Sequence, residues 1–326
     1  AGDQFGWSVS LSSDGSRVAV GGHTNDGAGG FDSGHVRVFE YDSLSSMWTQ
    51  LGADIVGEAA GDHSGFTVSL SSSGSRLAIG SPGSHDGGLR SGHTRIFEFV
   101  SSSWTQLGDD IEGEAEGDLS GGAVVLSSDG SRVAIGAQFN DGINGIHSGH
   151  VRVYEYESSL WIQLGAEIDG EAAGDWSGVA MSLSADGSRL VIGAQFHNAD
   201  GVNSSYVRVY DYSATSWVQL GTDIIGDEMN RNGSLSVSLS CDGGRLAVGS
   251  DGVGADRVRV YEYNFSSWNQ LGATLIEVGG GATGLSVSLS SDGSRVAIGA
   301  VMNDGGGDAG HVRIFDYDIL SLSWVQ

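Results

Sequence analysis

One short stretch, repeated six times, limits this chain to a small number of architectures. The copy at residues 126–136 reads Leu-Ser-Ser-Asp-Gly-Ser-Arg-Val-Ala-Ile-Gly, and close copies begin at Leu11, Leu70, Leu183, Leu239 and Leu289. Each copy alternates apolar and polar residues, passes through an Asp-Gly or Ser-Gly step (Cys-Asp-Gly-Gly in the fifth copy), and alternates again. Alternation with period two is typical of β-strands, and Asp-Gly accepts the positive φ of a tight primed turn. We therefore predict a β-hairpin with a two-residue turn in every repeat.

A second motif, Trp-x-Gln-Leu-Gly, recurs with the same period. Its tryptophans are Trp48, Trp104, Trp161, Trp217, Trp268 and Trp324, separated by 56, 57, 56, 51 and 56 residues. Each unit reads as four short strands, which in the first unit run near residues 5–12, 17–21 and 35–41 and from Trp48 onward. Six repeats of four strands are typical of a β-propeller, whereas a linear stack would need distinct polar caps. We predict an all-β protein, a six-bladed β-propeller of four-stranded antiparallel blades.

The predicted propeller is one domain that spans residues 1–326. The chain starts and stops inside a repeat, so we expect it to be a fragment of a larger protein. The blades are expected at residues 1–56, 57–113, 114–170, 171–226, 227–277 and 278–326.

The charge of the chain excludes some partners. Fifteen basic residues against 41 acidic ones give a net charge of −26, and the basic residues are all arginine. Such a surface repels phosphate backbones and anionic membranes, so we expect no nucleic acid as a partner. Membrane insertion is not expected either, because no apolar run is long enough to span a bilayer. Cations, in contrast, are attracted.

Two weaker signals in the sequence concern the cellular location of the protein. Cys241 is the only cysteine, so an internal disulfide is excluded. Three glycosylation sequons begin at Asn203, Asn232 and Asn264, and all three fall in predicted loops. We predict an extracellular or cell-surface location and a glycoprotein.

The units also resemble FG-GAP repeats, the blades of integrin α-subunit heads and of many secreted microbial and algal proteins. The resemblance is carried by Phe5-Gly6, by the Ser-Val-Ser-Leu-Ser strand that follows, and by Arg-Leu-Ala-Ile-Gly-Ser-Pro ending at Pro82. It covers the whole chain and implies a propeller that acts in adhesion or assembly. The calcium loop that such blades often carry between their first two strands is absent here, because that connection is too short to wrap an ion.

Most arginines belong to the repeat and are therefore predicted to be structural. Six follow the hairpin turn, and six lie in the third strand with an acid three residues later, as in Arg37 and Glu40. Alternation places that arginine and that acid on opposite faces, so each should pair with a neighbouring strand or blade. The tryptophans are likewise read as packing residues. A specific site must then come from residues that break the repeat.

The loops that follow the second strand of each blade share one side of a propeller with the loops that join successive blades. They are rich in Asn, Asp and Gly, and oxygen ligands of this kind suit Ca²⁺. The competing interpretation is turn chemistry on an acidic surface. Zinc held by histidines is less favoured, because no two histidines have a typical metal spacing. Ca²⁺ is the only cofactor expected, and the predicted ligands are Asp26, Asp86, Asp141, Asp200, Asp251 and Asp304.

No catalytic motif stands out in the sequence. A G-x-S-x-G elbow and an H-E-x-x-H pair are absent, and without lysine no lysine-dependent chemistry is available. We therefore predict that the chain is not an enzyme but an extracellular binding or structural module for adhesion or protein assembly. The alternatives are a lectin-like propeller and, third, a glycosidase or lyase. Other proteins or extracellular glycans are the expected partners. The expected ligand face contains His63, Trp176, His197, Tyr206 and Arg231.

Overall fold

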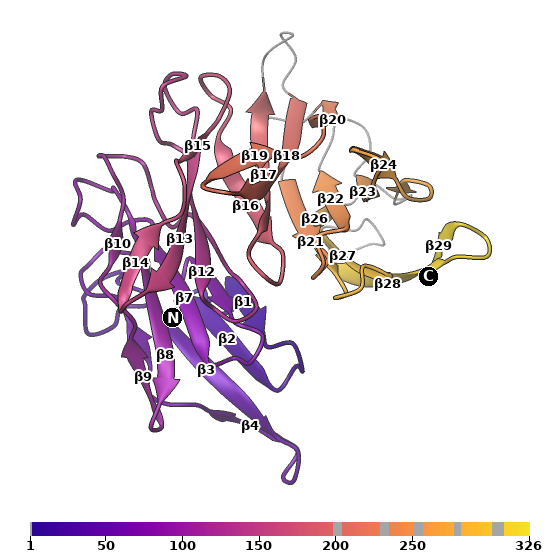
Figure 1. Cartoon of the computed structure of the whole chain (residues 1–326). Coiled ribbons are helices and arrows are strands. Elements are labelled where there is room, and N and C mark those ends of the chain that lie inside the picture. The colour runs from indigo at the N-terminus through magenta and orange to yellow at the C-terminus, as the bar shows by residue number, and fades with distance from the viewer. Residues whose placement is uncertain (1, 198–203, 229–234, 251–256, 277–281, 302–309) are drawn as a thin grey trace. The chain divides into compact units, whose positions relative to one another are not determined.

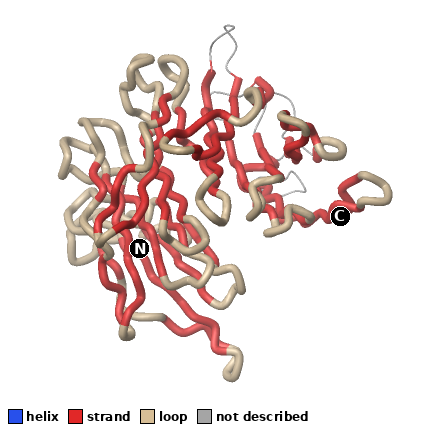
Figure 2. The backbone as a smooth tube through the Cα atoms, in the orientation of Figure 1, coloured by secondary structure: helices blue, strands red, loops and turns tan. Residues whose placement is uncertain are grey.

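A computed structural model describes residues 2–197, 204–228, 235–250, 257–276, 282–301 and 310–326. All of the regular secondary structure in these residues is β-strand, as Figure 2 shows. The strands form six antiparallel sheets that follow one another along the chain (Figure 1). The chain is thus all-β, and the predicted six-bladed propeller of four-stranded blades is confirmed. Within the described residues, no helix is long and apolar enough to cross a membrane.

Two compact units divide the chain, Ala1–Asp169 and Gly170–Gln326, and each contains three blades. The first blade consists of β1 (Ser8–Leu11), β2 (Arg17–Gly22), β3 (His35–Asp42), β4 (Met47–Gln50) and β5 (Ile55–Val56). The second consists of β6 (Thr67–Leu70), β7 (Arg76–Ser81), β8 (His93–Val100), β9 (Ser103–Gln106) and β10 (Ile111–Glu112). The third consists of β11 (Ala123–Leu126), β12 (Arg132–Ala137), β13 (His150–Glu157), β14 (Leu160–Gln163) and β15 (Ile168–Asp169).

The second unit repeats this pattern. Its fourth blade consists of β16 (Ser177–Leu183), β17 (Arg189–His197), β18 (Ser204–Ser213), β19 (Ser216–Gln219) and β20 (Ile224–Glu228). The fifth consists of β21 (Leu235–Leu239), β22 (Arg245–Ser250), β23 (Arg257–Asn264), β24 (Ser267–Gln270) and β25 (Leu275–Ile276). The sixth consists of β26 (Ala282–Leu289), β27 (Arg295–Val301), β28 (His311–Asp318) and β29 (Ser323–Val325).

The fourth strand of a blade is split in two by the Trp-x-Gln-Leu-Gly motif. In the first blade, β4 and β5 both pair with β3, and Gly52 lies between them with φ of +80°. This left-handed conformation is readily adopted only by glycine, so the glycine of the motif provides the break. The indole Nε1 of Trp104 donates a hydrogen bond of 2.9 Å to the carbonyl oxygen of Leu51 in the preceding blade. The motif therefore both shapes a strand and joins two blades.

The loop between the first and second strands of each blade differs from the predicted two-residue primed turn. Ser12 and Arg17 close a four-residue loop through a hydrogen bond of 2.9 Å from Ser12 N to Arg17 O. Only Gly15 has a positive φ in this loop, and its N–H donates to Ser12 O. Asp14 accepts from Ser12 Oγ at 2.7 Å and from Ser16 N at 2.9 Å, which lowers the pKa of Asp14 to about 2. The aspartate side chain thus stabilises a longer loop that the Asp-Gly step alone does not indicate.

Successive blades pack their apolar faces together, and the repeat arginines link their edges. Val36 and Val38 of β3 are buried in one cluster with Leu77 of β7. Arg17 lies opposite Glu40 in the β2–β3 register, and its Nε donates to that carboxylate at 2.9 Å. The acid of the third strand thus pairs with a neighbouring strand, as predicted.

Candidate functional site

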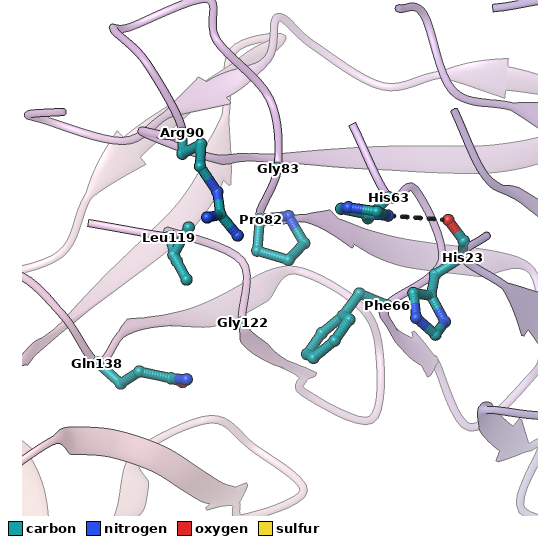
Figure 3. Close-up of a pocket in the computed structure, with 9 residues that line it drawn as sticks. All are labelled: His23, His63, Phe66, Pro82, Gly83, Arg90, Leu119, Gly122 and Gln138. Carbon is teal, nitrogen blue, oxygen red and sulfur yellow. Dashed lines mark hydrogen bonds between the residues drawn. The ribbon is translucent and has the colours of Figure 1, made fainter. Parts of the chain in front are cut away.

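A small pocket lies in the first unit, where loops of its three blades meet. Its volume is about 190 Å³, and Figure 3 shows the side chains that surround it. The lining comes from residues directly after β2, β7 and β12, from the β7–β8 loop, and from the loops that join successive blades. These are the two kinds of loop that a propeller places on one side. The lining residues are His23, His63, Phe66, Pro82, Gly83, Arg90, Leu119, Gly122 and Gln138.

The orientation of the His63 ring defines its chemistry. Its Nδ1 lies 3.3 Å from the carbonyl oxygen of His23, and a carbonyl oxygen can only accept a hydrogen bond. Nδ1 therefore carries the proton in the neutral ring, and Nε2 has the lone pair. Figure 3 shows this second nitrogen on the side of Pro82 and Arg90, away from the His23 carbonyl. His63 thus presents a basic nitrogen to the pocket.

His23 forms the aromatic wall beside it. Its ring centroid is 4.8 Å from that of Trp7, 5.4 Å from that of Phe66 and 5.8 Å from that of His63. The side chain is buried, and this burial, together with the nearby His63, lowers the pKa of His23 below its usual value. His23 is therefore a neutral ring near pH 7.

Three lining residues have left-handed backbone conformations that are unfavourable for side chains other than glycine. The φ angles are +55° for His63, +58° for Arg90 and +52° for Leu119. The equivalent residues of other blades, Gln4, Asp32, His147 and Trp176, have the same conformation, so it belongs to the repeat and fixes the direction of the side chain at each position. Arg90 is on the opposite side of the pocket from His63 (Figure 3) and provides the positive charge of the lining.

A second group of chemically active side chains lies in the second blade, outside the pocket. Asp86 is in the β7–β8 loop, His93 begins β8, and Asp110 and Glu112 lie at β10. Ligand atoms of these four residues all lie within 4.8 Å of one another. Burial, followed by repulsion from Asp86 and Asp110, raises the pKa of Glu112 to about 7. This group could hold a metal ion.

The third blade has a related group of side chains that already includes the positive charge of an arginine. Glu114, His150 and Glu167 offer ligand atoms at similar separations. However, Nη1 of Arg152 lies 3.3 Å from Glu114. Burial and the charge of Arg152 lower the pKa of His150 to about 4. The arginine thus provides the positive charge that a metal ion would bring.

Two of the other predicted calcium ligands lie in the described residues, and neither belongs to these groups. Asp26 accepts a hydrogen bond of 3.0 Å from the N–H of Asp32, and Asp141 accepts one of 2.8 Å from the N–H of His147. Both carboxylates therefore have the loop-stabilising role of the competing interpretation. Asp200, Asp251 and Asp304 lie outside the described residues.

The residues of the predicted ligand face do not lie together in one place. His63 lines the pocket, whereas Trp176 belongs to the second unit, where its ring packs edge-on against Phe196 at 4.8 Å. His197 is the last residue of β17, and Arg231 lies outside the described residues. Tyr206 is 1% exposed, and its hydroxyl donates to Asp175 at 3.3 Å. Tyr206 is thus a core residue and not part of a ligand-binding surface.

The sequons have a similar outcome. Asn203 and Asn232 lie outside the described residues, and Asn264 is the exposed last residue of β23, at a strand end instead of in a loop.

Three of the pocket residues could have been found by comparing repeats. The position two residues after the repeated glycine of the second strand (Gly21 in the first blade) holds a different residue in nearly every blade: His23, Pro82, Gln138, Gln195, Asp251 and Val301. Such variation within a strict repeat indicates a position that is free to acquire a function. Arg90 gave no such signal, because its loop varies in length and composition between blades.

Comparison with known proteins gives one family match, limited to the first repeat, and a set of structures with the same fold. The family model described as FG-GAP repeat matches residues 1–39, which confirms the predicted resemblance for the first repeat. No curated protein sequence matches this chain.

Several solved structures resemble the chain over 98% of its length. A candidate 6-phosphogluconolactonase from Bacteroides uniformis has a TM-score of 0.65 at 11% identity, with 83% of that chain covered. The periplasmic gluconolactonase of Pseudomonas aeruginosa has a TM-score of 0.62 at 16% identity, again with 83% covered. A candidate 6-phosphogluconolactonase from Bacteroides fragilis has a TM-score of 0.61 at 12% identity, with 82% covered. At these identities the similarity shows a common fold.

These similarities correct our prediction of function. We predicted a non-catalytic module and no enzyme, whereas these three similar structures are named as lactonases. The prediction was wrong because it depended on linear catalytic motifs. In a propeller, side chains from separate blades can form a pocket without any such motif.

Proposed function

We propose that this chain is a hydrolase that opens a small lactone ring in the pocket of His23, His63 and Arg90. The observation that carries the proposal is the Nε2 of His63, which faces the pocket with Arg90 on the opposite side. The common fold with structures named as lactonases supports the reaction class. The volume of about 190 Å³ suits a single small ring.

In the proposed reaction, His63 is the general base. Its Nε2 takes a proton from a water molecule as the water oxygen forms a bond to the lactone carbonyl carbon. The hydrogen bond from Nδ1 to the His23 carbonyl stabilises the imidazolium that results. When the bond between the carbonyl carbon and the ring oxygen breaks, the proton passes from His63 to that oxygen. The product is an open-chain hydroxy acid, and His63 is neutral again.

Arg90 and Gln138 provide the electrostatic part of the proposed reaction. Negative charge develops on the carbonyl oxygen in the transition state, and donors fixed in position stabilise it. The guanidinium of Arg90 and the carboxamide of Gln138 are the side-chain donors that Figure 3 shows on the side of the pocket away from His63. Arg90 would also bind the carboxylate of the product or a phosphate on the substrate.

The test is hydrolysis of gluconolactone and of its 6-phosphate, followed by acid release and corrected for the uncatalysed reaction. We expect His63→Gln to lower kcat by about 10²- to 10⁴-fold. Arg90→Gln should raise KM, and more for the phosphorylated lactone. The matched control is His85→Gln, because His85 is an exposed histidine of the same β7–β8 loop that does not line the pocket. Hydrolysis no faster than the uncatalysed rate, or full activity of His63→Gln, would contradict the proposal.

The location and the cofactor are proposed at a coarser level. The similar structure from Pseudomonas aeruginosa is described as periplasmic, which supports the predicted location outside the cytoplasm. Of the six aspartates predicted to bind Ca²⁺, only Asp86 belongs to a group that could hold a metal ion in the described part of the chain. A divalent cation at Asp86 therefore stays a proposal, and a thermal melt with added cation against the same sample in chelator tests it.

A further inference from the structure

We propose that Asp86, His93, Asp110 and Glu112 form a binding site for one divalent cation of the zinc class. The site lies outside the pocket, and its ligands take no part in the hydrolysis proposed there. Its ligands come from three places in the second blade: the β7–β8 loop, the start of β8 and the segment that leads into β10. A bound ion would tie these three segments together.

The register of the sheet brings the ligands to one point. His93 lies directly opposite Glu112 in the β8–β10 pair, and Asp110 is two residues before Glu112. Nδ1 of His93 lies 3.4 Å from Asp86 Oδ2 and 3.9 Å from Asp110 Oδ2. Ligands at about 2.0–2.1 Å in a tetrahedron are about 3.4 Å apart, so these separations leave room for an ion after small side-chain rotations.

His93 is an observation that points to a ligand independently of the acids. Its side chain is completely buried, and neither ring nitrogen has a hydrogen-bond partner. Oε2 of Glu112 is also buried without a partner. Buried polar atoms are normally hydrogen-bonded, because leaving them without a partner costs free energy. A cation between His93 and Glu112 would satisfy both.

The carboxylates are already positioned by their neighbours. Asp86 accepts a hydrogen bond of 2.9 Å from Ser84 Oγ, and Asp110 accepts one from Gln106 Nε2. Metal-binding carboxylates usually have such supporting hydrogen bonds, which hold them in place.

The first blade shows what the same position looks like without a site. His35 is the equivalent of His93 and is also buried without a partner, but it lies opposite Val56 instead of an acid. Asp54, the equivalent of Asp110, is held by Arg37 through a 2.8 Å contact between Nη2 and Oδ2. Glu112 therefore distinguishes the second blade from the first, whereas the third blade has Asp169 opposite His150.

The ligand set selects the class of ion. Three carboxylates favour a divalent cation, and the imidazole favours Zn²⁺ and related transition metals over Ca²⁺ or Mg²⁺, which prefer oxygen ligands only. The ion also has a structural consequence. Asp86 and the pocket residue Arg90 share the β7–β8 loop, so the ion would fix the loop that carries Arg90.

The experiment is titration calorimetry of chelator-treated full-length chain with ZnCl₂, together with thermal melts in ZnCl₂ and in CaCl₂. We expect one Zn²⁺ per chain and a higher melting midpoint with Zn²⁺ than with Ca²⁺ at equal concentration. His93→Gln and Glu112→Val should each weaken Zn²⁺ binding at least tenfold. Glu112→Val introduces the residue found in the first blade, so it is expected to fold, and its circular dichroism checks this.

His35→Gln is the matched control and should bind Zn²⁺ as the wild type does. The proposal is overturned if Zn²⁺ does not bind at a one-to-one ratio, or if His93→Gln and a folded Glu112→Val bind it with unchanged affinity. Equal or stronger stabilisation by Ca²⁺ would overturn the assignment of the ion. None of these measurements uses hydrolysis, so they succeed or fail separately from the proposed activity.

Discussion

Nη1 of Arg245 donates a hydrogen bond of 3.2 Å to the carbonyl oxygen of Gly293 and so links the fifth blade to the first loop of the sixth. The same guanidinium contacts Glu262 at 3.0 Å and lies 5.5 Å from the ring centroid of Tyr317. A side chain on Gly293 would collide with the Arg245 stem, since its Cβ would lie 2.7 Å from Cδ. The repeated arginine and the repeated glycine are thus parts of one blade-to-blade contact.

We therefore expect Arg245→Ala to destabilise the second unit. The variant loses a charged hydrogen bond to a backbone carbonyl, so the free energy of unfolding should fall by about 2 kcal/mol. Arg295→Ala is the control in the same unit, because Arg295 and its partner Asp316 are each 60% exposed. An exposed ion pair contributes less than about 1 kcal/mol. Urea denaturation measures both variants, and equal losses would contradict the inter-blade role of Arg245.

Gly52 provides a second test of the blade contacts. Its φ is +80°, and an added Cβ would lie 2.9 Å from Cδ1 of Trp104. Gly52→Ala combines backbone strain with overpacking, so we expect a loss of about 3 kcal/mol. Gly15 has φ of +69° with nothing within 4 Å of an added Cβ, so Gly15→Ala should lose only about 1 kcal/mol. If the two variants unfold at the same urea concentration, the contact with Trp104 does not contribute to the free energy of unfolding.

The architecture could be predicted from the sequence because each blade has the same local requirements. Trp104 and Arg17 are repeat residues, and repetition alone indicated that they pack or pair. The turn at Asp14 was mispredicted because a side-chain hydrogen bond, which the Asp-Gly pattern does not reveal, favours a longer loop. The candidate sites could be predicted only in part, through His63 and Asp86. His93 and Glu112 are brought together by the β8–β10 register, and the direction of His63 depends on a left-handed backbone that its neighbours impose.

His150 makes the first unit sensitive to acid. Its pKa is about 4 in the folded chain and 6.5 without structure, so the unfolded chain binds its proton first as the pH falls. The neutral ring contributes about 3 kcal/mol to the free energy of unfolding, and this contribution is fully present above pH 6.5. It is lost as the pH falls from 6.5 to about 4. Arg152 faces the ring and disfavours its charged form, and Glu114 has an oxygen 3.9 Å from Nδ1. Glu167 and Asp169 are the other acids beside the ring.

A variant isolates this contribution. Tyr206 occupies the position of His150 in the fourth blade, so His150→Tyr introduces a residue that the repeat already accommodates. Urea denaturation at a series of pH values should show a smaller loss of stability in the variant than in the wild type between pH 6.5 and 4. Parallel curves for the two proteins would show that His150 does not contribute.

Gly122 tests the shape of the pocket. An added Cβ would lie 2.9 Å from Oε1 of Gln138 and 3.2 Å from the carbonyl oxygen of Leu119. The Gln138 side chain can rotate away, so Gly122→Ala should cost less than about 1 kcal/mol of stability. The displaced carboxamide narrows the pocket and loses its place beside the substrate, so we expect KM for gluconolactone to rise several-fold while kcat, which depends on His63, changes less. Adding Gln138→Ala removes the contact, so the two substitutions should not be additive in KM. If Gly122→Ala leaves KM unchanged although Gln138→Ala alone raises it, the added methyl group has not displaced the carboxamide.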